Sequence, residues 1–208
     1  MPHTSSRLVL ASGSATRREL LDRLKLPYTV DPADIDETLA ADESPQAACL
    51  RLARGKAECV AARRPEAVVL GSDQMLAWRD GILGKPGDAE TARRQLAAIA
   101  GEMIAFHVAI SIACPDGRRL DWHETVEARM RELTEEEITR YVEIEQPFDC
   151  AGSMRSEGLG VCLVEHMDSG DPSAILGMPL IATARLLREA GIDPLGRPGG
   201  VTGRSPSA

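Results

Sequence analysis

The sequence lacks the features of a secreted or membrane protein. No apolar run approaches the roughly 18 residues that a membrane span requires, and the first ten residues lack the apolar core of a secretory signal. The five cysteines form no C-x-x-C pair, so their pattern indicates neither a zinc site nor a disulfide framework. These absences predict a cytoplasmic protein with reduced thiols.

A basic surplus is also missing. The 208 residues include 24 Lys and Arg against 32 Asp and Glu, for a net charge of -8. This balance argues against binding to nucleic acid or to an anionic membrane, because both need a basic surface. A small anion can still bind in a local basic pocket.

The composition fits one globular domain, or two lobes around one cleft, because 43% of the residues are hydrophobic and can fill a sizeable core. We assign residues 1–192 to this domain. From residue 193 onward glycine, proline and serine dominate, so residues 193–208 are predicted to be a disordered tail.

Apolar periodicity and turn residues predict an α/β chain. Gly71 is expected to end a buried strand and so to leave Asp73 at a strand end, where ligands gather in open α/β sheets. The predicted helices are Thr16–Leu26, 45–63, Ala89–Ala100, a helix that starts after Thr134, and Pro179–Ala190. The predicted strands are 8–10, Tyr28–Val30, Ala67–Leu70, Met75–Trp78, 82–83, Ala105–Cys114, Leu120–Met130 and Val161–Glu165.

The segment LVLASGSATRR, residues 8–18, predicts an anion site, because an apolar strand runs through serines into a helix start. A cation near a helix N-terminus costs about 0.3–1 kcal/mol, so Arg17 and Arg18 need a reason to be there. A phosphate held by free amides, by the hydroxyls of Ser12 and Ser14 and by a guanidinium would supply one. The alternative is that Ser14 only caps the helix and both arginines are solvated.

Other charged residues extend this pattern. Lys56 falls on the buried side of its predicted helix, where it must pair or extend its amine to solvent, and Lys85 follows a turn. Asp36, Glu37 and Asp73 supply carboxylates, which bind a polyphosphate only through a divalent metal; Mg²⁺ suits one or two carboxylates plus substrate oxygens. For Asp36, a simple turn cap is the alternative.

Seven motifs together resemble the Maf nucleotide pyrophosphatases over residues 7–190. They are LVLASGSATRRELL, IDET, LARGKA, GSDQ, GKP, CAGSMRSEG and GMPL, in the family's order and spacing. The resemblance implies a mixed, twisted sheet with flanking helices and two lobes around a deep nucleotide-binding cleft. It also implies metal-dependent (Mg²⁺ or Mn²⁺) hydrolysis of a nucleoside triphosphate to the monophosphate and pyrophosphate, and a possible homodimer.

The same resemblance assigns roles to particular positions. Asp73 matches the proton acceptor, and Glu37 matches the motif glutamate, so these two are our metal candidates. The predicted substrate-binding residues are Ser12, Ser14, Arg17, Arg18, Glu37, Lys56 and Lys85.

Three positions bear on which nucleotide is used. Gln74 and Glu157 resemble the branch that acts on 7-methyl-GTP, and a carboxylate suits guanine because it accepts from the ring N–H and the amine. Thr16 departs from this branch, which often has tryptophan there; Trp78 compensates only if it reaches the base. The alternatives are a pyrophosphatase for pyrimidine or other nucleotides, and a nucleotide-binding regulator of cell division.

Overall fold

A computed structural model describes residues 7–196 of the chain. Within this range, helices and strands alternate in the first half and long antiparallel strands follow. The strands are β1 (Leu8–Leu10), β2 (Tyr28–Val30), β3 (Val68–Trp78), β4 (Gly81–Leu83), β5 (Met103–Ala113), β6 (Arg119–Met130) and β7 (Val164–Asp168). The helices are α1 (Ala15–Asp22), α2 (Pro45–Ala61), α3 (Ala89–Ile99), α4 (Glu135–Glu145) and α5 (Leu180–Glu189), with short 3-10 turns η1 (Ala151–Ser153), η2 (Leu159–Leu163) and η3 (Ala174–Leu176).

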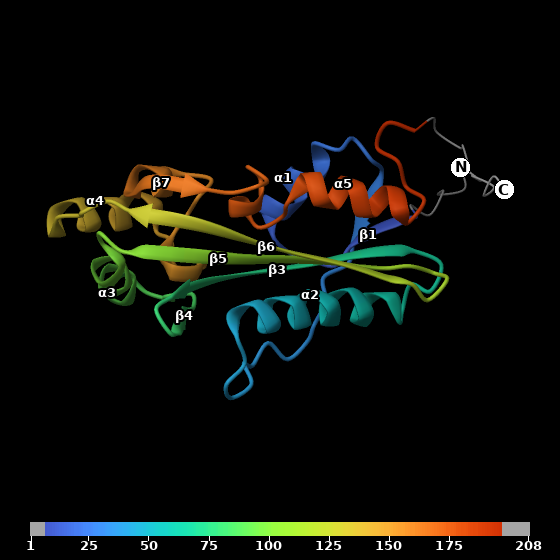
Figure 1. Ribbon diagram of the computed structural model, residues 1–208, viewed down its shortest axis with the longest axis horizontal. Helices are drawn as coiled ribbons and strands as arrows, with labels where there is room; N and C mark the ends of the chain where they lie inside the picture. The colour runs from blue at the N-terminus through green and yellow to red at the C-terminus, as the bar shows by residue number, and fades with distance from the viewer. Residues whose placement is uncertain (1–6, 197–208) are drawn as a thin grey trace.

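The strands form a mixed sheet in the order β2-β1-β3-β5-β6-β7, with β4 beside β3. The β1 strand is parallel to β2 and β3, whereas β3, β5, β6 and β7 pair antiparallel. Figure 1 shows the long strands crossing the molecule as a twisted sheet with helices against both faces. The α/β prediction of a mixed, twisted sheet with flanking helices is confirmed; the division into two lobes stays a prediction.

Alternating side chains divide the core between the two faces of the sheet. Leu8 and Leu10 pack with α1 and α5 on one face, whereas Val9 and Ala11 pack against α2 on the other. The same alternation runs along β3, so even-numbered residues such as Ser72 face α5 and odd-numbered residues such as Asp73 face α2.

The predicted strand end at Gly71 is wrong, because β3 continues without a break through Asp73 to Trp78. Its neighbour on one side changes instead: residues 68–70 pair with β1 and residues 76–78 pair with β4. Gly71 is needed for packing, since a Cβ there would overlap the Ala53 carbonyl oxygen of α2. Asp73 therefore lies in the middle of β3, within residues 71–75, which pair with neither β1 nor β4.

Most of the helix starts agree with their sequence signals. Ser14, Ser44 and Thr134 each accept a hydrogen bond from a backbone N–H in the first turn, and Thr134 completes a capping box with Glu137. The strand predicted at 161–165 is shifted, because η2 occupies 159–163 and β7 begins at Val164.

The predicted tail from residue 193 lies only partly within the described residues. Residues 193–196 form a hydrogen-bonded turn in which Asp193 accepts from the Leu195 and Gly196 amides. The remainder, 197–208, lies outside the described range, so its disorder stays a prediction.

Candidate active site

One cavity, of about 1000 Å³, collects nearly all of the predicted site residues. Its walls come from the β1–α1 connection, the loop before α2, α2 itself, the middle of β3, the segment after β4 and the segment after α4. The candidates that line it are Ser12, Ser14, Thr16, Arg17, Glu37, Lys56, Asp73, Gln74, Lys85 and Glu157. Residues more than 140 positions apart in the sequence therefore face one space of nucleotide size.

Asp73 and Lys56 form the buried floor of this cavity. The Lys56 amine lies 2.6 Å from Asp73 Oδ1, and the two side chains are 10% and 9% exposed, respectively. Gly71 permits this pairing, because its missing side chain lets α2 lie directly against β3. Lys56 therefore pairs rather than extending to solvent, which settles the alternative left open by its helical spacing.

Glu37 adds a second carboxylate to the same amine. Its Oε1 atom lies 2.8 Å from Lys56 Nζ, and its side chain is 57% exposed on the loop before α2. Burial by itself would raise the pKa of Glu37, but the hydrogen bond from Lys56 and the charges of Lys56, Lys85 and Arg17 outweigh it and lower the pKa. The cavity thus favours an ionised Glu37.

Asp36, by contrast, points to its own turn. Its Oδ1 atom accepts a hydrogen bond from the Thr38 amide at 2.8 Å, and its side chain is exposed. Asp36 is not among the residues that line the cavity. The turn-cap alternative therefore describes this residue better than a role in the site.

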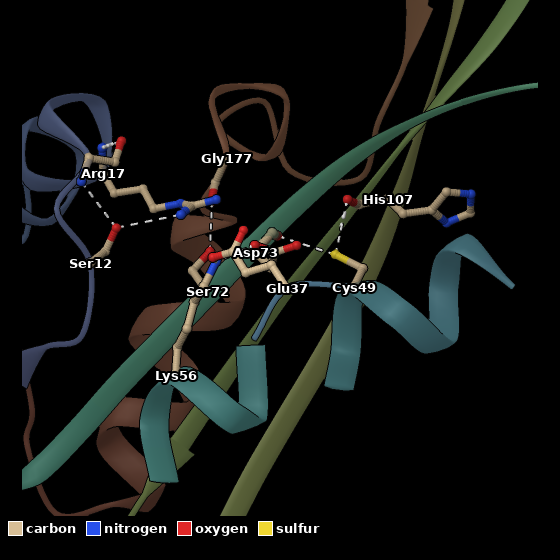
Figure 2. A network of polar contacts seen from close by, with 10 residues as sticks. Ser12, Arg17, Glu37, Cys49, Lys56, Ser72, Asp73, His107 and Gly177 are labelled. Atoms are coloured by element: carbon tan, nitrogen blue, oxygen red, sulfur yellow. Dashed lines mark hydrogen bonds and ion pairs between the residues drawn. The ribbon is translucent and has the colours of Figure 1, made fainter. Parts of the chain in front are cut away.

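The start of α1 presents the predicted anion-binding groups. The Ser14 hydroxyl accepts from the Arg17 amide, and the Ser12 hydroxyl accepts from the Ser14 amide at 3.2 Å (Figure 2 shows Ser12 with Arg17). The Arg17 guanidinium donates through Nε to the Gly177 carbonyl at 3.2 Å. Ser14 is thus both a helix cap and a cavity residue.

Arg18 is placed differently from its neighbour. It is exposed on α1 and does not line the cavity, and its carbonyl accepts from the Tyr28 hydroxyl. Successive residues on a helix point about 100° apart, and Arg18 lies on the side of α1 that faces away from the cavity. Arg17 therefore lines the cavity, as predicted, whereas Arg18 is a solvated surface arginine, which was the alternative reading.

The three positions predicted to set nucleotide preference come from α1, β3 and the segment after α4, and all three line the cavity. The Thr16 hydroxyl donates to Glu157 Oε1 at 2.9 Å, across 141 residues of sequence. Gln74 donates through Nε2 to the Ile175 carbonyl at 2.8 Å. Thr16 therefore contacts the candidate base-reading carboxylate, a link that no sequence pattern indicated.

Trp78 does not take the place of an aromatic residue at position 16. It is absent from the residues that line the cavity, and its ring lies under the Arg79 guanidinium, 4.4 Å from the ring centroid. The compensation considered for Trp78 is therefore wrong for this structure.

The donor set fits a divalent metal that arrives with a nucleotide. Among the described residues, no group of three His, Cys, Asp or Glu side chains is arranged to hold a metal ion. Asp73 and Glu37, however, converge on Lys56 and supply two carboxylates. Mg²⁺ takes one or two carboxylates and completes its shell with phosphate oxygens and water, and Asp73 and Glu37 supply that number of carboxylates.

Sequence reasoning missed three groups near the site: the Ser72 hydroxyl, the Gly177 carbonyl and the Arg155 guanidinium. Ser72 is fully buried behind Asp73 and donates to the Gly177 carbonyl at 2.8 Å. Arg155 lines the rim beside Asp149. Each stands in a motif noted in the sequence, GSDQ, GMPL or CAGSMRSEG, but nothing in those letters indicates which atoms meet.

Comparison with known proteins agrees with this architecture. The family model described as "Maf-like protein" matches residues 7–190, which include every residue of the cavity named above. The chain belongs to the Maf family.

Several relatives match over nearly their whole length. A 7-methyl-GTP pyrophosphatase of Chromohalobacter salexigens is 50% identical over 193 residues, which are 92% of this chain and 100% of that protein. The proteins of the same name from Idiomarina loihiensis and Xanthomonas campestris pv. campestris (strain 8004) are 45% and 47% identical, over 91% and 90% of this chain and 98% and 97% of their own lengths.

Among solved structures, the Staphylococcus aureus Ham1 protein shares the fold of this Maf protein. It superimposes with a TM-score of 0.50 at 17% identity, covering 88% of this chain and 98% of that one.

None of the helices in residues 7–196 has the length and apolar character needed to cross a membrane.

Proposed function

We propose that this Maf protein is a divalent-metal-dependent pyrophosphatase that hydrolyses 7-methyl-GTP, or a related modified nucleotide, to the nucleoside monophosphate and pyrophosphate. The observation that carries this proposal is the convergence of a buried Asp73–Lys56 pair, the Arg17 guanidinium and the Glu157 carboxylate on one cavity. The names of three relatives at 45–50% identity support the same substrate.

The cations serve the triphosphate tail. Arg17 offers terminal N–H groups in a planar fork that matches phosphate oxygens, and Lys56 and Lys85 add point charges from the floor and from the segment after β4. The hydroxyls of Ser12 and Ser14 and the backbone amides at the start of α1 donate hydrogen bonds to the remaining oxygens. Together they hold the chain of phosphates against β3.

Asp73 is the proposed proton acceptor. The residue is 6% exposed and lies at the floor, where its carboxylate orients a water for attack on phosphorus. A bond forms between the water oxygen and phosphorus, the α–β phosphoanhydride bond breaks, the water proton passes to Asp73, and pyrophosphate leaves. A bound Mg²⁺ or Mn²⁺ would be held by Asp73 and Glu37 and would neutralise charge on the phosphates.

Glu157 is the proposed reader of the base. A carboxylate accepts from both the ring N–H and the exocyclic amine of guanine, and its charge favours the positive charge that methylation at N7 adds. Pyrimidines offer no such pair of donors. Thr16 supports this reading because its hydroxyl holds one oxygen of Glu157 in place.

The proposed setting is cytoplasmic, which the five free cysteines favour, and the homodimer expected from the family resemblance stays part of the proposal.

The test is a turnover panel of 7-methyl-GTP, GTP, dTTP and UTP with Mg²⁺ or Mn²⁺, monitored by release of pyrophosphate. We expect the highest kcat/KM for 7-methyl-GTP. A preference for dTTP or UTP would replace the proposal with a pyrimidine nucleotide pyrophosphatase. Tight nucleotide binding without product would support the binding regulator instead.

A further inference from the structure

The turn before α5, residues 171–180, contains the GMPL motif and has no role in the chemistry described above. Gly177 lies in this turn with a φ of 97°, a conformation that favours glycine. Its carbonyl oxygen accepts two side-chain hydrogen bonds, from Ser72 Oγ at 2.8 Å and from Arg17 Nε at 3.2 Å. Figure 2 shows Arg17 and Ser72 meeting at Gly177 above Asp73.

This contact fixes one edge of the Arg17 guanidinium. Arginine has five N–H donors in a rigid plane, so anchoring Nε also sets the direction of the two terminal nitrogens. One of them, Nη1, lies 3.5 Å from the Ser12 hydroxyl, at the cavity wall. The Gly177 carbonyl thereby decides which way the fork faces.

The turn is itself held firmly. Asp171 is 3% exposed and accepts from the Ser173 amide and hydroxyl, at 2.9 and 2.6 Å, and from the Ile181 amide at the start of α5. Gln74, from β3, donates to the Ile175 carbonyl. The carbonyl of Gly177 is therefore presented by a turn that buried hydrogen bonds fix at both ends.

We propose that the Gly177 carbonyl, held by Ser72 and by the Asp171-anchored turn, orients Arg17 to receive the phosphate tail. Ser72 and Asp171 are then positioning residues that act through Arg17. The inference rests on the proposed function only in that the cavity binds a polyphosphate; it does not depend on which base is attached.

Ser72→Ala tests whether Ser72 orients Arg17 through the Gly177 carbonyl, with Ser111→Ala as its matched control. Ser111 is also fully buried and lies on the adjacent strand β5, but it faces α2 and its hydroxyl has no hydrogen-bond partner in the described part of the chain. We expect Ser72→Ala to weaken binding of inorganic triphosphate and to raise KM by about fivefold to tenfold, the scale of one neutral hydrogen bond. The kcat value should fall less than KM rises, and Ser111→Ala should change neither.

A double-mutant cycle separates orientation of Arg17 from general support of the floor. Lysine in place of Arg17 keeps the charge but has no Nε anchor for Gly177. In the Arg17→Lys background, Ser72→Ala should therefore change triphosphate binding by less than about twofold. Asp171→Asn loosens the far side of the same turn. In the Arg17→Lys background, it should likewise change triphosphate binding by less than about twofold.

Calorimetry with inorganic triphosphate keeps this test independent of substrate identity. Full, additive effects of Ser72→Ala and Asp171→Asn in the Arg17→Lys background would overturn the inference, as would equal losses in Ser111→Ala. If the wild type binds triphosphate but does not hydrolyse 7-methyl-GTP, the proposed function fails. The double-mutant cycle then still tests whether Ser72 and Asp171 act through Arg17.

Discussion

The floor and the rim of the cavity are built differently. The floor, Lys56 and Asp73, is buried, and its two side chains are joined by a hydrogen bond of 2.6 Å. The rim, Thr16, Asp149, Arg155 and Glu157, is exposed or half-buried, and its hydrogen bonds and ion pairs compete with water. A buried floor strengthens the electrostatic interactions of the charged groups that orient the attacking water. A wet rim suits the reading of a base that must enter and leave.

The largest expected effect on activity comes from a substitution in the floor of the cavity. Asp73→Asn should lower kcat by at least about 100-fold, because an amide cannot accept the proton from water. The substitution keeps the side-chain size, and Lys56 retains Glu37 as a partner. Pyrophosphate release measures the loss, while nucleotide binding and the thermal midpoint verify folding. Full activity in this variant would remove Asp73 from the proposed chemistry.

A change at the rim should alter preference rather than the rate of the step. Glu157→Gln should reduce kcat/KM for 7-methyl-GTP relative to UTP by about tenfold, because a charge-assisted acceptor is lost. Glu165→Gln is the control, since Glu165 is an exposed residue of β7 that does not line the cavity. An unchanged order of substrates would remove Glu157 from base recognition.

A smaller effect is expected from the residue that holds Glu157. Thr16→Val deletes the hydroxyl but keeps the shape, so we expect a twofold to fivefold loss of selectivity, about the value of one exposed hydrogen bond. Thr16→Ser keeps the donor and should behave like the wild type. If Val and Ser give the same selectivity, the Thr16–Glu157 contact does not contribute.

The smallest effect on activity should come from outside both regions. Asp31, which follows β2, accepts hydrogen bonds from Arg63 and Arg64, and these lower its pKa to about 2. A lowered folded pKa adds stability that is fully present above the unfolded value of 3.8 and is lost as pH falls towards 2. Between those values, the wild type should lose more stability than Asp31→Asn in chemical denaturation, with kcat at pH 7 unchanged. Parallel curves for the two proteins would contradict this assignment.

Local signals in the sequence predicted the frame of the molecule better than its contacts. The helix starts predicted after Ser14, at residue 45 and after Thr134 agree with the structure, because capping depends on neighbours three residues apart. Gly71 misled, because glycine signals a turn, a bulge or close packing alike, and only the position of α2 decides among them.

The site was predictable as a set of residues but not as an arrangement. Charge and motif placed Arg17, Lys56 and Asp73 in one cavity, and the structure brings them to it. The pairing of Thr16 with Glu157 and the meeting of Ser72 and Arg17 at Gly177 join segments more than 100 residues apart. Such contacts depend on tertiary packing, which spacing along the chain does not encode.

The interval along β3 between the partners β1 and β4 has a consequence for how this protein can change. Residues 71–75 have β5 on one side, while the pairings described on the other side stop at 70 and resume at 76. The opening thus comes from strand lengths and connectivity instead of from any particular side chain. Side chains around this opening can therefore vary without changing the strand pairings that create it.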